Sequence, residues 1–292
     1  RYIYWIAEAQ FGGGDFTDAA ETFVTFSKNY PDSPLQLRAV VTAASARAQA
    51  KQWPAVERLL EETNGVFQRA EKSNPGDELV SRGRLLLAQA KFARKNYSGA
   101  RTILDSLKSQ SLSASLDWQR ADLVYQNESA AGDDNAALAA ATNLLQIARR
   151  AGNADWLAES AAARADELEK LNRTGEAIAT YSENLATNAP AERQRQAILK
   201  IAALAIAQKK FSDAETNLEN YLAQFPDAPA VDLAALTLGE LELRNFAAQP
   251  AATNHLAAAQ SRFNQFIGAF PNSPLLGKAY LDRGWCNWLT WE

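Results

Sequence analysis

The sequence has few of the residues that break helices or build chemical sites. Its 292 residues include 14 glycines, 10 prolines, one histidine, one cysteine and no methionine. A single cysteine, Cys286, excludes an internal disulfide, and a single histidine, His255, excludes a metal site with two histidine ligands. The most apolar stretch, 198–207, spans only about ten residues and contains Lys200, so it is too short to cross a bilayer. We expect no metal, no cofactor and no membrane insertion in this segment.

A large excess of either charge is also missing. The chain carries 30 basic and 34 acidic residues, and no run of lysine or arginine is longer than two. Nucleic-acid binding normally requires a basic patch that neutralises phosphates, so the balanced charge argues against a nucleic-acid partner. Apolar residues make up 47% of the chain, which is ample for a continuous core. Alanine-rich segments without β-branched alternation predict an all-α fold with almost no strand.

Three segments, 23–34, 218–229 and 263–274, align without gaps. Each has apolar or aromatic residues at its first, fourth and eighth positions, which lie on one face of a helix. The proline after the eighth position ends that helix, and a second proline is expected at the first position of the next helix. Ser33 and Ser273 are expected to cap these following helices.

A small residue also recurs along the chain, twelve positions before a stopping proline where one is present. It follows an aromatic residue by three at Phe16 and Ala19, and again at Phe211 and Ala214. The full set of seven is Ala19, Val56, Ala100, Ala137, Ala177, Ala214 and Ala259. Their separations of 37 to 45 residues predict one helical hairpin per repeat.

A second small residue is expected twelve positions earlier, where the first helix of each hairpin crosses the second closely. The residues that fit are Ala7, Ala44, Ala88, Ala165 and Ala202. Tyr125 does not fit, and the seventh repeat needs about eight extra residues near 245–253 to place Gly239 correctly. The fourth and seventh repeats therefore follow the pattern least well.

Taken together, these signals predict fifteen helices in one domain, 1–292, without a linker that would mark a boundary. The expected helices are 1–11, 16–29, 34–50, 54–72, 77–94, 97–110, 116–131, 134–150, 154–171, 174–187, 191–208, 211–224, 229–245, 250–269 and 274–291. Because the chain begins and ends inside predicted helices and lacks methionine, we expect it to be a fragment of a longer protein.

Several motifs resemble tetratricopeptide repeats. They are Gly14-Asp15-Phe16-x-x-Ala19, Tyr30-Pro31-Asp32-Ser33-Pro34 and Ala279-Tyr280-x-x-x-Gly284-Trp285. The aromatic-proline junctions are similar to those of bacterial envelope proteins of the outer-membrane assembly and Tol-Pal accessory types. The resemblance implies an α-solenoid of about seven hairpins plus a terminal helix, wound as a right-handed superhelix. It also implies a scaffold that binds a protein or peptide in a concave groove, in the periplasm or cell envelope. A cytosolic adaptor stays open as an alternative.

By this resemblance, groove positions lie six residues before and one residue after each small crossing residue. The candidate partner-binding residues are Arg38, Arg82, Gln89, Gln119, Gln126 and Glu159. Their polar character fits a wall that is not core, and the arginines are suited to binding carboxylates of an extended peptide. The alternative is that these arginines are ordinary solvated residues, since exposed charges need no partner.

Aromatic residues gather at both ends of the chain. Tyr4 and Trp5 lie near the start, and Trp285, Trp288 and Trp291 lie near the end, at spacings that place them on helix sides. A solenoid in water normally ends in polar caps. We therefore expect end interfaces, buried either against further repeats of a longer chain or against a second copy of this one.

No pattern indicates a catalytic site. His255 and Cys286 lie far apart in sequence, and a helix-surface histidine and a core cysteine explain them. The glycines 12–14 lack the strand and lysine of a phosphate-binding loop, and 133–135 lack calcium-loop spacing, so a helix cap explains them better. Acid pairs such as 61–62 leave an all-helical, carboxylate-dependent hydrolase as an alternative function. We expect a scaffold and not an enzyme.

Overall fold

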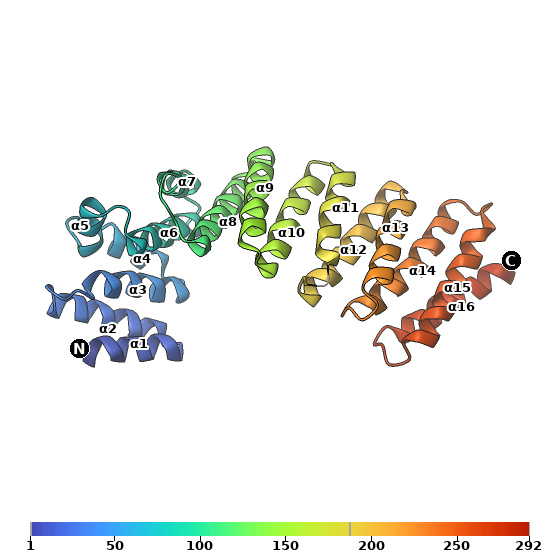
Figure 1. Ribbon diagram of the computed structural model, residues 1–292, viewed down its shortest axis with the longest axis horizontal. Helices are drawn as coiled ribbons and strands as arrows, with labels where there is room; N and C mark the ends of the chain where they lie inside the picture. The colour runs from blue at the N-terminus through green and yellow to red at the C-terminus, as the bar shows by residue number, and fades with distance from the viewer. Residues whose placement is uncertain (1, 187, 292) are drawn as a thin grey trace. The chain divides into compact units, whose positions relative to one another are not determined.

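The computed structural model describes residues 2–186 and 188–291, and the side chain of Trp291 lies outside the described part. This part is helical with no strand, and its helices follow one another along the chain (Figure 1). The first nine are α1 Tyr2–Gly13, α2 Phe16–Asn29, α3 Gln36–Gln49, α4 Trp53–Leu60, α5 Val66–Ser73, α6 Glu78–Ala93, α7 Tyr97–Ser106, α8 Ala114–Ala131 and α9 Asp134–Ala151. The others are α10 Ala154–Lys170, α11 Thr174–Ser182, the short 3₁₀ helix η1 Glu183–Leu185, α12 Ala191–Gln208, α13 Phe211–Gln224, α14 Val231–Ala248, α15 Thr253–Ala269 and α16 Leu276–Trp291.

The chain divides into two compact units, residues 1–147 and 148–292, and the division falls inside α9. Each unit is described by itself, and the expectation of a single domain stays a prediction. The expected hairpins are α1–α2, α3–α4, α6–α7, α8–α9, α10–α11, α12–α13 and α14–α15, with α16 as the terminal helix.

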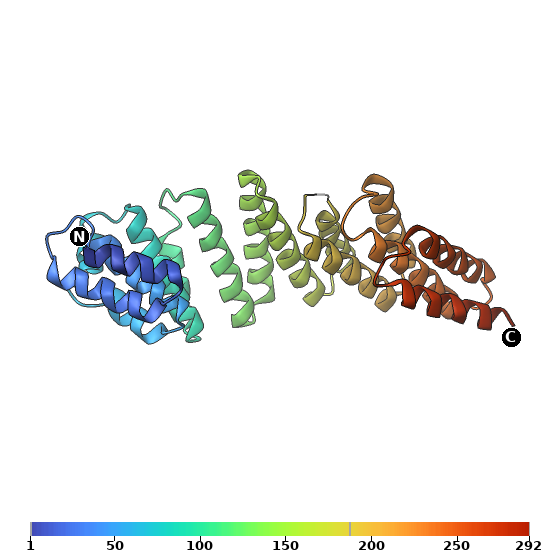
Figure 2. The same cartoon turned by 90° about the horizontal axis from the view of Figure 1, so that it is seen from below.

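From α3 onward, first helices of neighbouring hairpins lie side by side within each unit (Figures 1 and 2). In the first unit α3 contacts α6, and α6 contacts α8. In the second unit α10 contacts α12, α12 contacts α14, and α14 contacts α16. This packing confirms the expected stack of helical hairpins. It also gives each unit a surface made of first helices alone, which we call the first-helix face.

The recurring small residues form the buried spine of the stack. All seven second-helix positions have no exposed surface, including Val56 and Ala137 of the weakly matching repeats. On the first helices Ala165 is fully buried and Ala202 is 8% exposed, whereas Tyr125 is only half-buried. Small side chains let two helix backbones approach closely, and a larger group would overpack the contact. The spacing argument therefore found the core correctly.

Six hairpins share a turn that was not predicted from the sequence. A residue with positive φ stands five positions before each small second-helix residue, in order Gly14, Lys51, Lys95, Gly132, Asn172 and Lys209. The next residue donates its backbone N–H to a carbonyl five positions back, as from Gln52 to Arg47 at 2.8 Å. This is the Schellman arrangement that ends a helix and reverses the chain at once. Three lysines and one asparagine adopt it, although glycine would fit with less strain.

The aromatic-proline junctions behave nearly as expected. Ser33 Oγ accepts a hydrogen bond from the N–H of Leu35 at 3.3 Å, and Ser273 Oγ accepts one from Leu275 at 3.1 Å. The helices themselves begin later, at Gln36 and Leu276, so the prolines lie in the preceding turn and not at the first helical position. The Asp133 side chain accepts from the N–H of Ala136 at 2.9 Å, which confirms that it caps a helix.

The prediction of one helix over 54–72 is wrong. The structure has two helices there, α4 and α5, and it has sixteen α-helices in the described residues instead of fifteen. The break falls where Asn64 adopts a φ of +57° and Gly65 follows it, because a left-handed residue cannot continue an α-helix. Thirty-two positions separate Val56 from Ala88, against twenty-five between Ala19 and Ala44, so the surplus of seven makes room for α5.

The insertion expected in the seventh hairpin is present, and it lengthens helices. Beyond its crossing residue Gly239, α14 continues for nine residues, whereas α12 continues for six beyond Ala202. Before Ala259, α15 has six residues, whereas α13 has three before Ala214. The connecting loop has four residues instead of two. The seventh hairpin thus extends past its neighbour by almost one turn on both helices.

Candidate partner-binding surface

The positions expected to line a groove lie on first helices and face solvent. All six candidate residues are exposed: Arg38, Arg82, Gln89, Gln119, Gln126 and Glu159. They alternate along their helices with the buried spine, so the exposed and buried faces of the first helices are cleanly separated. The binding role of these six residues stays a prediction.

In the first unit these side chains interact mainly with their own helices. Arg82 pairs with Glu78 at 3.2 Å, one turn earlier, and both side chains are more than half exposed. Gln126 donates to Asp122 at 2.7 Å, and Gln119 donates to a serine one turn earlier. Exposed pairs of this kind contribute little stability, so a partner could replace these contacts at low cost.

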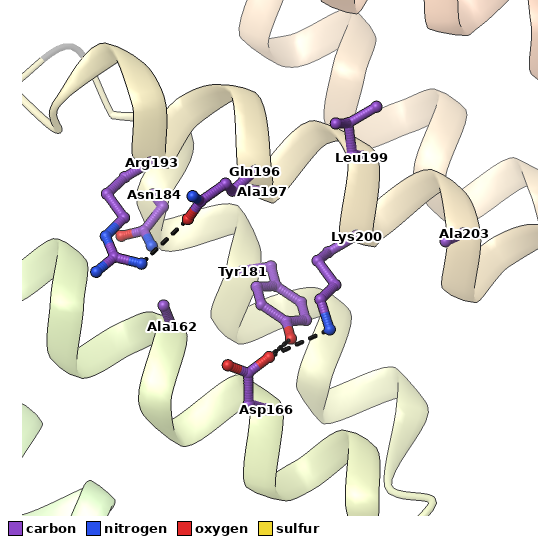
Figure 3. A pocket seen from close by; sticks show the side chains of 10 residues that line it. All are labelled: Ala162, Asp166, Tyr181, Asn184, Arg193, Gln196, Ala197, Leu199, Lys200 and Ala203. Atoms are coloured by element: carbon purple, nitrogen blue, oxygen red, sulfur yellow. Dashed lines mark hydrogen bonds and ion pairs between the residues drawn. The ribbon is translucent and has the colours of Figure 1, made fainter.

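In the second unit, groove positions gather around a hollow of about 390 Å³ on the first-helix face, the α10–α12 hollow (Figure 3). Its wall comes from α10 and α12, with one residue each from α11 and η1 behind them. The lining residues are Ala162, Asp166, Tyr181, Asn184, Arg193, Gln196, Ala197, Leu199, Lys200 and Ala203. Three of them, Asp166, Gln196 and Ala203, are groove positions expected from the repeat register. The repeat register thus contributes three of the lining residues, and their binding role stays a prediction.

A cluster of hydrogen-bonded side chains forms the inner wall of the α10–α12 hollow. Tyr181, which is 3% exposed, donates its hydroxyl to Asp166 at 2.5 Å and lies 3.1 Å from a carboxylate oxygen of Glu169. Lys200 lies 2.8 Å from Glu169 and 3.3 Å from Asp166, and its ammonium is 5.7 Å from the centre of the tyrosine ring. Figure 3 shows the Asp166, Tyr181 and Lys200 side chains converging. Three helices, α10, α11 and α12, are joined here.

Burial and these carboxylates fix the protonation of the cluster. Burial, aided by the hydrogen bond and charge of Asp166, raises the pKa of the Tyr181 phenol far above its usual range. Burial alone would lower the pKa of Lys200, but the hydrogen bond to Glu169 and the charge of Asp166 outweigh it and raise that pKa. The tyrosine therefore stays a neutral hydroxyl and the lysine stays a cation at neutral pH. Such a cluster can orient a binding surface, but it offers no activated nucleophile or base.

Tyr181, Asn184, Arg193 and Lys200 had not been identified from the sequence. Tyr181 and Asn184 lie on or just after a second helix, outside the register that defines groove positions, and they reach the hollow from behind. Asn184 donates to the backbone carbonyl of Ala158 at 2.9 Å and is 3% exposed. A polar residue at an otherwise apolar second-helix position was the one signal available in the sequence.

The aromatic residues expected to form a cluster at each end of the chain are only partly exposed at its surface. Tyr4 is 3% exposed and packs edge-on against Phe23 and Phe26 of its own unit, so it belongs to the core and not to an end surface. Trp5 is 65% exposed, and Trp285 and Trp288 are about half exposed, with ring centroids 5.5 Å apart. The predicted role of Trp291 falls on a side chain outside the described residues.

The residues considered for chemistry have structural surroundings. Cys286 is fully buried, and burial with the charge of Asp282 raises the pKa of its thiol to about 11. His255 is partly buried, with Nδ1 2.7 Å from a carboxylate oxygen of Glu242. Within residues 2–186 and 188–290, no group of three or more His, Cys, Asp and Glu side chains is placed to hold a metal ion. None of the helices described is both long and apolar enough to cross a bilayer.

Stacked helical hairpins with a small-residue spine define the class as a helical repeat protein. A tetratricopeptide-repeat family model matches residues 2–33, and the family model YfiO, an outer membrane lipoprotein, matches residues 163–280. Together with the hairpins and their junctions, these matches over separate parts of the chain support a protein of tetratricopeptide-like repeats. A comparison with curated protein sequences gave no match. Proteins of this repeat class bind proteins or peptides.

Solved structures with a similar chain path share little sequence. BtubC from P. vanneervenii is 16% identical, with 77% of this chain and 92% of that chain covered and a TM-score of 0.44. A signal-transduction ATPase with a tetratricopeptide repeat sensor, from Pyrococcus horikoshii, is 11% identical, covering 94% of this chain and 50% of that one, with a TM-score of 0.38. A Rap protein complexed with competence and sporulation factor is 10% identical, covering 98% and 94%, with a TM-score of 0.41.

Proposed function

We propose that this chain is a non-enzymatic scaffold that holds a partner protein or peptide on its first-helix faces. The observation that carries the proposal is the hollow between α10 and α12, where positions expected from the repeat register line a solvent-open cavity. Its polar groups are ion-paired and hydrogen-bonded to one another, which suits a rigid binding wall better than a reaction centre.

The family match over residues 163–280 supports a proposal for the location of the scaffold. We place the scaffold in a bacterial cell envelope assembly because that match is to an outer membrane lipoprotein and because the aromatic-proline junctions are similar to those of envelope proteins. The exposed Trp5 and Trp288 extend the proposal to the ends of the chain, where they would bury against another repeat or a second copy. Light scattering over a range of concentrations tests self-association, and a strict monomer would exclude a second copy as the occupant.

Site-specific photo-crosslinking in the native cells tests the scaffold. A photoreactive amino acid would replace Gln89, Gln126 or Gln196 on first helices, and matched controls would carry it at the exposed Thr102 and Asn220 on second helices. We expect one and the same partner to crosslink to the first-helix positions and not to the controls. Equal crosslinking at both sets, or none at the first-helix positions with the folded protein present, would exclude binding on this face.

A further inference from the structure

The insertion in the seventh hairpin builds a second hollow, which we call the α12–α16 hollow. Its volume is about 640 Å³, and its walls come from α12, α14 and α16 of the second unit. The lining residues are Ile206, Glu240, Leu243, Arg244, Phe246, Ala247, Pro250, Lys278, Asp282, Trp285 and Leu289. Phe246 and Ala247 belong to the added turn of α14, and Pro250 belongs to the lengthened loop. A hairpin of ordinary length would lack these three residues of the wall.

An apolar strip on α12 connects the two hollows. Leu199, Ala203 and Ile206 are exposed and follow one another at spacings of four and three, so they lie on one side of the helix. Leu199 and Ala203 line the α10–α12 hollow, and Ile206 lines the α12–α16 hollow. Leu199 is 56% exposed and Ile206 is 38% exposed. The six candidate groove residues are all polar, so exposed aliphatic groups on this part of the first-helix face indicate an interaction site.

Apolar side chains also form the floor of the α12–α16 hollow. Leu243, Phe246 and Leu289 are half-buried and pack on the core around the fully buried Phe263. Trp285 stands at the rim and is 50% exposed. A deep apolar floor with an exposed aromatic residue at its edge is the usual form of a pocket that receives one large apolar side chain of a partner.

Acidic and basic side chains are equal in number around each hollow when Glu169 is counted at the first, and in each hollow an arginine is the base with the weakest carboxylate pairing. In the α12–α16 hollow, Lys278 contacts both Glu240 and Asp282, the latter at 2.9 Å. Burial would lower the pKa of Lys278, but its hydrogen bonds to the two acids outweigh burial and raise that pKa, so the two acids share one lysine cation. Arg244 is exposed and has no carboxylate within 4.0 Å in the described part of the chain. Its guanidinium is therefore available to a carboxylate from outside.

The first hollow repeats this arrangement. Asp166 and Glu169 share Lys200, as described above, and Arg193 lies at the opposite side of the hollow, where it donates a hydrogen bond to Gln196 at 3.0 Å (Figure 3). The nearest carboxylate to Arg193 is that of Glu159, 4.0 Å away. Each hollow thus combines apolar surface, internally paired acids and one arginine with weak or no pairing. The occupant that complements both is apolar with acidic flanks.

We propose that the two hollows and the α12 strip form a docking surface for an acidic amphipathic helix of a partner protein. The proposal rests on the scaffold function proposed above and names the site and partner chemistry. Leu199 and Ile206 lie seven residues, or about 10 Å, apart along α12. Apolar side chains seven residues apart on a partner helix have the same spacing, which allows one to enter each hollow. Aspartate or glutamate beside them would reach Arg193 and Arg244.

Peptide selection tests this surface without knowledge of the partner. Phage-displayed random 16-residue peptides would be selected on the whole chain, and the enriched peptides would be measured by fluorescence anisotropy. We expect enriched peptides with apolar residues three, four and seven apart and an excess of acidic residues. Ile206→Asp should weaken their binding about ten-fold or more, and Arg244→Glu should weaken it about three-fold or more in a salt-dependent way. Tyr280→Asp, an exposed apolar residue of α16 outside both hollows, should leave it unchanged.

Several results would overturn the proposal. They are enrichment of basic peptides, binding that Ile206→Asp leaves intact while circular dichroism shows a folded chain, or no enrichment at all. A partner that still crosslinks in cells to Gln89 and Gln126 would then show that the scaffold function holds and that only this site is misassigned. Loss of crosslinking at those positions as well would mean that the scaffold function itself has failed.

Discussion

Two hairpins have about seven or eight more residues than the others, and the added residues fold in opposite ways. In the second hairpin the added residues form the separate helix α5, whose Phe67 is 1% exposed and packs among buried residues of α3, α4 and α6. In the seventh hairpin they lengthen α14 and α15, and Phe246 stays half-buried in the wall of an open hollow. The first insertion enlarges the core, and the second creates surface.

The difference depends on whether the added segment can fold back on the stack. Asn64 and Gly65 allow a sharp break, so α5 turns and covers α3 and α6. The seventh hairpin has no left-handed residue in its turn, and its helices continue straight past their neighbours. The added residues of the seventh hairpin extend past the end of the neighbouring hairpin, so fewer side chains are there to cover them. Their apolar groups therefore stay available to a partner.

Truncation of the two aromatic residues gives the largest contrast. Phe67→Ala should lower the free energy of unfolding of the first unit by about 3–5 kcal/mol, because it opens a cavity in the core. Phe246→Ala removes a half-buried ring and should cost the second unit only about 1–2 kcal/mol. Urea denaturation monitored by hydrogen exchange would assign each loss to its unit. Equal losses would mean that the two insertions do not differ in the way described.

Adding a methyl group at two glycines tests the packing beside each insertion. A Cβ at Gly83 would lie 2.1 Å from the Phe67 ring, and one at Gly239 would lie 2.6 Å from the Phe263 ring. Gly83→Ala and Gly239→Ala should each cost about 1–3 kcal/mol, measured by thermal unfolding. Gly284→Ala is the control, since nothing lies within 4 Å of its Cβ position and the change should be neutral or slightly stabilising.

A second substitution, in the ring that clashes with the new methyl group, should affect the two glycine sites differently. Phe67→Leu should relieve part of the cost of Gly83→Ala, because the clashing ring comes from the added helix α5 and can be reduced there. The corresponding Phe263→Leu should relieve less, since Phe263 lies on the regular helix α15 and is fully buried in the core of its unit. Equal rescue at both sites would show that α5 is packed no differently from a regular second helix.

The spine and the hairpins could be predicted from the sequence because small residues repeat at fixed distances. A small side chain at a helix crossing is a local requirement, so even weak repeats kept it, as at Val56 and Ala137. The split at Asn64 was missed because the apolar pattern on both sides of it continues at helical spacing. One left-handed residue overrides that pattern, and asparagine at such a position also occurs inside loops and caps.

The candidate site was predictable only where it belongs to the repeat register. Gln196 and Asp166 were found from their offset to a buried alanine, whereas Tyr181 reaches the hollow from a second helix and depends on tertiary packing. Glu240, Lys278 and Trp285 of the α12–α16 hollow also lie at these offsets, from Gly239 and Gly284, but the hollow itself was not predicted, although the insertion near 245–253 was. The number of added residues does not say whether they fold back or extend, since that depends on the neighbours they meet.

A partly buried acid beside the lengthened hairpin gives the second unit a charge interaction that depends on pH. Glu215 of α13 has a carboxylate oxygen that is buried with no hydrogen-bond partner among the described residues. Burial raises the pKa of Glu215, and the charge of Glu242 on α14 raises it further. The other charges near it are those of His255 on α15, Glu219 and Arg262. The folded second unit therefore binds a proton at Glu215 more tightly than the unfolded chain does.

This shift has a definite sign and a small expected size. Because the folded pKa of Glu215 exceeds the unfolded one, stability falls as pH rises from the ordinary glutamate range through the raised value. Glu215→Gln removes the charge and should raise the Tm of the second unit by roughly 1–2 °C at pH 7, with a much smaller gain near pH 4, where the carboxyl is mostly protonated in both states. The exposed Glu21→Gln, in the first unit, serves as the control and should show no such dependence. Thermal unfolding across that pH range decides the matter, since a gain that is the same at every pH would trace to packing instead of to the buried charge.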